Sequence, residues 1–192
     1  FLNRYTAEAP KWLNEGLAEY FEGWRMTPEG TLVEKRTNLF DLKLLQGCLN
    51  DGKFLRPREL VAFTRDEFDD FKKNHPELHP YLHYATAWSL LWFSLESSED
   101  KRDRARVLEY LKRLCSVGEN ARFEVKDWDD FEARWKKAVL ALTAEPVEAV
   151  DYVLLAGGYQ EDDDWEAAAK LFEGALAKDP KLAGARFELG YC

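Results

Sequence analysis

The chain has 192 residues, a formal net charge of −9 and a sequence pI near 5.0. This acidic balance, and the lack of a basic run interleaved with aromatic residues, argue against a nucleic-acid-binding protein. Hydrophobic residues make up 46% of the chain, which is typical of a globular protein with a real core. The longest apolar run, near Trp88–Phe93, is far too short to span a bilayer.

Helical periodicity dominates the first three quarters of the sequence. Apolar residues at helical spacing predict helices over residues 10–24, 39–49, 58–63, 65–73, 80–97, 101–116 and 128–142. Thr64 with Glu67, and Asp127 with Asp130, are typical of helix N-terminal caps. The turn signal at residues 27–30 predicts at most one short β-hairpin. Strand propensity is otherwise scarce, so we expect a mostly α fold.

The pattern changes from Asp151 onward. Eight residues match the landmark spacings of the tetratricopeptide repeat: Tyr152, Leu155, Ala156, Tyr159, Ala168, Phe172, Ala175 and Pro180. Leu189 and Gly190 repeat Leu155 and Ala156 after 34 residues, so a second repeat begins near Leu182. We therefore expect a helical domain over residues 1–146 and a tetratricopeptide helical hairpin over residues 147–192. The alternative is an ordinary helical hairpin that ends a domain.

One helix carries the sharpest motif, W-L-N-E-G-L-A-E-Y over residues 12–20. It resembles the glutamate helix of the gluzincin metallopeptidases, the group that includes thermolysin and aminopeptidase N. In that group the glutamate of N-E-G-[LF]-A is a zinc ligand, so the resemblance places a metal ligand on Glu15. Glu19, one turn later, would orient a ligating histidine by accepting its second N–H. Gly16 is small enough for another backbone to approach closely. The alternative is a surface helix with solvated glutamates.

A second segment, Y-A-T-A-W-S-L-L over residues 84–91, resembles the helix of aminopeptidase-like gluzincins whose tyrosine donates a hydrogen bond to the oxyanion. The resemblance implies a catalytic role for Tyr84; the alternative is a core tyrosine. The order of elements over residues 1–143 is also similar to the peptidase MA-like family, formerly described as a domain of unknown function. The chain would then be the C-terminal helical part of a gluzincin-like domain whose N-terminal portion is missing.

The resemblance implies a zinc peptidase in the full-length parent, with a peptide or protein substrate and a protein partner bound by the repeats. It also implies a secreted or periplasmic location. H-E-x-x-H, which would supply two histidine ligands and the general base, does not occur in these 192 residues. We therefore expect this chain alone to be inactive. The alternative function is a non-catalytic, peptidase-like scaffold that binds protein partners through the repeats.

Histidines and cysteines give no other metal motif. His75, His79 and His83 lie four residues apart, but Pro80 would clash inside a helix that spanned all of them. We expect a solvated helix start there instead of a metal site. The three cysteines form no C-x-x-C pair, so neither a zinc knuckle nor a disulfide scaffold is indicated.

Overall fold

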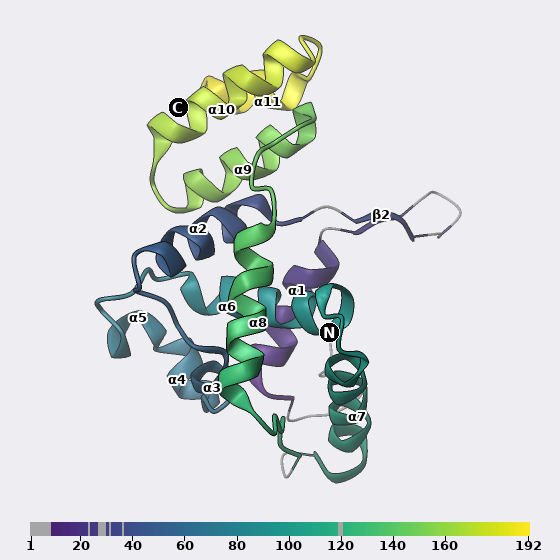
Figure 1. Cartoon of the computed structure of the whole chain (residues 1–192). Coiled ribbons are helices and arrows are strands. Elements are labelled where there is room, and N and C mark those ends of the chain that lie inside the picture. Colours follow the sequence, from purple (N-terminus) through teal and green to yellow (C-terminus); the bar gives the residue numbers. More distant parts are fainter. Residues whose placement is uncertain (1–8, 23, 27–29, 31, 36, 119–120) are drawn as a thin grey trace. The chain divides into compact units, whose positions relative to one another are not determined.

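The computed structural model describes residues 9–22, 24–26, 30, 32–35, 37–118 and 121–192, and the fold is mostly α, as predicted (Figure 1). The elements in chain order are α1 (Lys11–Glu22), β1 (Trp24–Met26), β2 (Leu32–Lys35), α2 (Leu39–Asn50), α3 (Pro57–Leu60), α4 (Arg65–Asp69), α5 (Phe71–Asn74), α6 (Leu82–Trp92), a π-helical segment (Phe93–Ser97), α7 (Lys101–Val117), α8 (Trp128–Ala141), α9 (Ala149–Glu161), α10 (Trp165–Lys178) and α11 (Ala183–Leu189). Among the described residues, no helix combines the length and the apolar character needed to cross a membrane.

The chain divides into two compact units. The first unit comprises residues 1–36 and 44–142, and the second comprises residues 37–43 and 143–192. One of the divisions between the units falls between residues 142 and 143; the domain boundary between residues 146 and 147 stays a prediction from the sequence. The assignment of residues 37–43 to the second unit was not predicted, because hydrophobic periodicity continues through them into the rest of α2.

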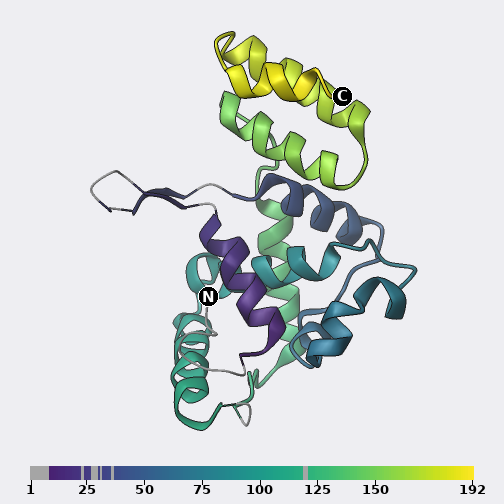
Figure 2. The same cartoon turned by 180° about the vertical axis from the view of Figure 1, so that it is seen from behind.

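Helix α6 forms the centre of the core of the first unit. Every residue of α6 except Tyr84 is buried. Its two buried hydroxyls are satisfied locally: Thr86 donates to the Leu82 carbonyl at 2.7 Å, and Ser89 donates to the Thr86 carbonyl at 2.9 Å. Ser89 also accepts a hydrogen bond from the indole of Trp135 at 3.1 Å. Helix α1 packs directly against α6 (Figure 2).

The helix predicted over residues 80–97 changes its geometry near its end. Beyond Trp92 the chain forms a π-helical turn, Phe93–Ser97, closed by a hydrogen bond from the Ser98 N–H to the Phe93 carbonyl at 2.8 Å. This turn carries Glu96, which accepts a hydrogen bond from the hydroxyl of Tyr20 on α1. Burial raises the pKa of Tyr20, and the hydrogen bond to Glu96 raises it further.

The short hairpin that the sequence predicted is present. Strands β1 and β2 are antiparallel, and they pair Trp24 with Lys35 and Arg25 with Glu34. The register shifts between Arg25 and Met26, because Met26 pairs with Leu32. A shift of this kind is typical of a β-bulge. The predicted turn residues 27–29 lie outside the described residues.

The second unit is built on a helical hairpin of α9 and α10, with α11 packed against α10. Its buried core consists of the small residues Ala156, Ala168, Ala175 and Ala185 around one large ring, Phe172. The ring of Tyr152 lies over Gly174, where a Cβ atom would come within 2.6 Å of a ring carbon. Small residues thus allow α9 and α10 to approach closely.

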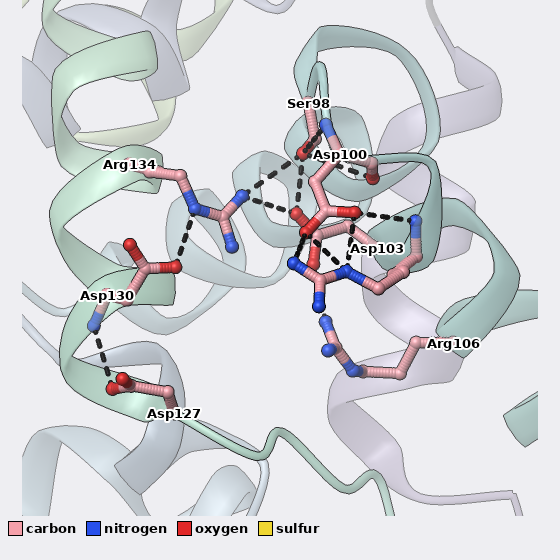
Figure 3. A network of polar contacts seen from close by, with 8 residues as sticks. Ser98, Asp100, Asp103, Arg106, Asp127, Asp130 and Arg134 are labelled. Atoms are coloured by element: carbon pink, nitrogen blue, oxygen red, sulfur yellow. Dashed lines mark hydrogen bonds and ion pairs between the residues drawn. The ribbon is translucent and has the colours of Figure 1, made fainter.

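A buried charge network joins the end of the π-helical segment to α7 and α8 in the first unit (Figure 3). Asp103 has no exposed side-chain surface, and its carboxylate accepts hydrogen bonds from Ser98, Arg106 and Arg134. Arg134 also donates to the exposed Asp130 at 2.9 Å. Burial would raise the pKa of Asp103, but the hydrogen bonds from Arg134, Ser98 and Arg106 outweigh burial and hold it below its usual range.

Replacing Asp103 should strongly destabilise the protein. Asp103→Ala leaves two partly exposed arginines without their buried partner, and the loss of these charge-assisted hydrogen bonds should cost about 1–3 kcal/mol. Asp130→Ala is the matched control, because Asp130 binds the same arginine from an exposed position and should contribute less than about 1 kcal/mol. Urea unfolding gives both free energies. Equal losses in the two variants would contradict this account of Asp103.

Candidate functional site

The candidate site depends on a close crossing of α1 and α6. A Cβ atom placed on Gly16 would lie 2.9 Å from the carbonyl oxygen of Ala87 and 3.1 Å from Cδ1 of Leu91. Contacts of this length with a backbone atom are too short for an ordinary side chain, so only glycine allows the helices to cross at this separation. The glycine of the predicted N-E-G-L-A motif is therefore the point of contact with α6. The sequence predicted that a backbone could approach here, but not which one.

The crossing brings the predicted site residues together. Tyr84 is half-buried; burial raises the pKa of its phenol, and the negative charge of Glu15 raises it further. Glu19 acts on Tyr84 in the same direction, whereas the positive charge of Lys11 opposes it. Glu15, Glu19 and Tyr84 thus lie within electrostatic reach of one another, although they come from two separate helices.

The carboxylate of Glu15 is held by its neighbours on α1. Lys11 Nζ lies 3.3 Å from Glu15 Oε1, and the Asn14 amide donates to the same oxygen at 3.2 Å. Lys11 Nζ also lies 3.5 Å from Asp69 Oδ1 on α4. Burial would lower the pKa of Lys11, but the hydrogen bond and charge of Glu15, together with Asp69, raise it overall.

Sequence reasoning missed Lys11 and Asp69. The first had a usable signal, because a lysine four residues before a glutamate on one helix is a typical ion pair. The second had none, because its proximity to Lys11 arises from the packing of α4 near α1. Both charges bear on the site, since both act on the phenol of Tyr84.

The expectation that all three histidines lie at a solvated helix start is wrong for His83. Its side chain is buried, with ring centroids 4.4 Å from Phe71, 4.5 Å from Phe68 and 4.2 Å from Tyr84. Its Nδ1 has no hydrogen-bond partner in the described part of the chain. Burial lowers the pKa of His83 to about 4, so the ring is neutral at pH 7. The aromatic rings that bury His83 lie on α4 and α5, and local sequence patterns around Pro80 do not indicate this packing.

The described residues do not form a complete metal site. No group of three histidine, cysteine, aspartate or glutamate side chains within them is placed to hold a metal ion. A catalytic zinc site takes three protein ligands and one open position. The partly exposed carboxylate of Glu15 is the candidate for one of these ligands, and it lies within electrostatic reach of Tyr84. Zinc therefore remains a prediction, and no chemical step can be assigned to it from these residues.

The glycine crossing can be tested by adding one methyl group. Gly16→Ala should lower the free energy of unfolding by about 1–2 kcal/mol, because the cost of overpacking exceeds the gain in helix propensity. Gly47→Ala in α2 is the matched control, since a Cβ atom there has no neighbour within 4 Å. It should raise stability by about 0.5–1 kcal/mol. Denaturant unfolding of the two variants checks the sign, and stabilisation by Gly16→Ala would contradict the close crossing.

The burial of His83 predicts a pH effect. In the unfolded chain the ring takes up a proton near its ordinary pKa of 6.5, whereas in the folded protein it does so only near 4. The folded state therefore loses stability as pH falls from about 6.5 to about 4, by up to about 3 kcal/mol. His83→Phe should remove the part of this stability loss that comes from protonating His83. Denaturant unfolding at a series of pH values measures the free energy of unfolding of both proteins. Equal losses of stability in the parent and in His83→Phe would contradict the assignment of this pH effect to His83.

Comparison with known families identifies the family to which the chain belongs. A family model described as "Protein of unknown function (DUF1570)" matches residues 2–116, which include α1, α6 and most of α7. No curated protein and no solved structure matches the chain. The matched segment contains Glu15, Glu19 and Tyr84 and covers more than half of the sequence. The chain therefore belongs to the DUF1570 family of proteins of unknown function.

Proposed function

We propose that this chain is part of a gluzincin-type zinc metallopeptidase of the peptidase MA-like kind, in which Glu15 is a zinc ligand. The observation that supports the proposal is the crossing of α1 and α6 at Gly16, with Glu15 on one helix within electrostatic reach of Tyr84 on the other. Each of these residues was singled out from a separate sequence segment. The roles of Glu15 and Tyr84 come from their sequence motifs alone, so their positions in the fold support the proposal independently.

Each side chain then has a defined task. Glu15 provides a carboxylate ligand, and a bound zinc ion would act as a Lewis acid that activates a water molecule. Tyr84 keeps its proton, because burial and neighbouring carboxylates raise its pKa, and it can donate that O–H to the developing negative charge on a substrate carbonyl oxygen. Glu19 would fix a ligating histidine by accepting its second N–H. Two histidine ligands and the general base would come from outside this sequence.

The second unit would recruit a protein partner. Its support is the match between the repeat spacing and the buried positions: Ala156, Ala168, Phe172 and Ala175 all lie in the core of the hairpin. A single repeat buries little of its own surface, and stacked repeats present extended binding faces. The partner would be the peptidase substrate or a component that holds it.

One observation favours the second candidate function, a non-catalytic scaffold. The ammonium group of Lys11 lies 3.3 Å from Glu15, so the carboxylate has a counter-ion without any metal. In a scaffold this ion pair would be permanent. In a metallopeptidase Lys11 would leave Glu15 when the zinc ion binds, and it would retain Asp69 as its partner.

Graded substitutions on α1 separate the two functions. In the full-length protein, Glu15→Gln should weaken zinc binding sharply, because a neutral amide is a poor ligand of nearly the same shape. Glu19→Gln should weaken it about 10–100-fold, the usual cost of losing a group that orients a ligand. Glu22→Gln, at the exposed end of α1, should have no effect. Zinc titration with circular dichroism as the folding control measures all three, and unchanged zinc affinity in Glu15→Gln would sink the metallopeptidase proposal.

A further inference from the structure

An open pocket of about 330 Å³ lies on the first unit, away from Glu15 and Tyr84. Its lining residues come from the segment before α3 and from one face of α8: Phe54, Arg56, Asp129, Glu132, Ala133 and Lys136. The α8 positions recur at helical spacing, so a single face of that helix forms one wall. The volume falls at the lower end of the range for small-molecule sites.

The carboxylates of the pocket are already neutralised by arginines. Glu132 is buried, and Arg58 binds it in a bidentate manner, with Nε 3.0 Å from Oε1 and Nη2 2.9 Å from Oε2. Arg56 Nε donates to the same carboxylate at 2.9 Å. Burial would raise the pKa of Glu132, but these hydrogen bonds outweigh burial and keep it below its usual range. The exposed Asp129 forms an ion pair with Arg58.

Positive charge is therefore in excess at the pocket. Arg56, Arg58 and Lys136 are three cations beside the two carboxylates of Asp129 and Glu132, in a chain whose net charge is −9. Arg56 uses Nε and Nη2 to bind Glu132, and within the described residues its Nη1 has no acceptor. Lys136 Nζ makes one long hydrogen bond, 3.4 Å to the Leu49 carbonyl, and so retains donors for a ligand.

An aromatic ring lies next to these donors. Lys136 Nζ is 5.2 Å from the centroid of the Phe54 ring, and that ring is only half-buried. Phe54 also packs against Trp135 in the core, with ring centroids 6.4 Å apart. Phe54 thus contacts a core residue and also lines the pocket. A guanidinium, an ammonium and an apolar surface converge on one small volume.

We propose that this pocket binds a small organic anion that joins a carboxylate to an apolar group. The carboxylate would accept hydrogen bonds from Arg56 and Lys136, and the apolar group would pack on Phe54. The C-terminal apolar residue of a peptide and a free aryl-substituted acid share this chemistry. The site uses none of the residues assigned to zinc or the oxyanion, so it stands independently of the proposed peptidase function.

The test is a calorimetric titration of the whole chain with N-acetylphenylalanine. Saturable binding is expected, and both N-acetylphenylalanine amide and acetate should bind at least about tenfold more weakly, because each lacks one half of the recognised group. Lys136→Met should weaken binding about 10–100-fold, whereas Lys136→Arg should retain it. Lys137→Met is the matched control, because Lys137 is exposed on the same helix outside the pocket, and it should bind as the parent does.

Three results would each overturn the proposal: no saturable binding to the parent, equal affinity for the amide, or parent-like affinity in Lys136→Met. Circular dichroism and the thermal midpoint show whether each variant is folded. If Lys136→Met does not fold, Lys136→Gln takes its place with the same expected loss. The tripeptide Gly-Gly-Phe distinguishes the two ligand sources. If it binds more tightly than N-acetylphenylalanine does, the ligand is a peptide C-terminus; if it binds more weakly, the ligand is a free acid.

Discussion

The contact between Gly16 and the Ala87 carbonyl is the constraint on which the candidate site depends. Helix α6 is buried along its whole length except at Tyr84, and α1 crosses it with Gly16 against the Ala87 carbonyl and the Leu91 side chain. The separation of the two helices is therefore set by backbone atoms, which cannot adjust as flexible side chains do. The position of Glu15 relative to Tyr84 follows from this rigid crossing. A site formed in this way is preorganised by packing rather than by its own polar contacts.

Helix α8 shows how buried charges can hold a helix in a core. Arg134 binds Asp103 on α7, and Glu132 binds Arg56 and Arg58 from the segment around the start of α3. Asp103 and Glu132 each have two cationic partners, which is the arrangement in which burial of charge is tolerated. The apolar residues Phe131, Trp135 and Val139 fill the space between these charged attachments. Charge here fixes the orientation of the helix, while apolar burial supplies most of the stability.

Local signals predicted the elements well, and contacts between distant segments account for what they missed. Asp127 accepts a hydrogen bond from the Asp130 N–H, and Thr64 with Glu67 forms a complete capping box, as their spacing indicated. The burial of His83 and the pairing of Lys11 with Asp69 depend on how α4 and α5 pack, which periodicity does not encode. The pocket likewise combines Phe54 with Lys136, which are far apart in the sequence. Of the site, the sequence identified candidate residues but not their environment.

The π-helical turn has a consequence for the way this family can vary. Such a turn holds one residue more than an α-helical turn, so the loss of one residue between Phe93 and Ser97 would restore α-helical geometry. The residues after the turn would keep their orientation, because five residues of a π-helical turn rotate the chain about as far as four residues of an α-helix. Loss of Glu96 itself would remove its hydrogen bond with Tyr20 but would leave Ser98 beside Asp103. Relatives shortened by one residue at this position should therefore retain Ser98 and Asp103, so the length of this helix can vary without disturbing the buried charges that follow it.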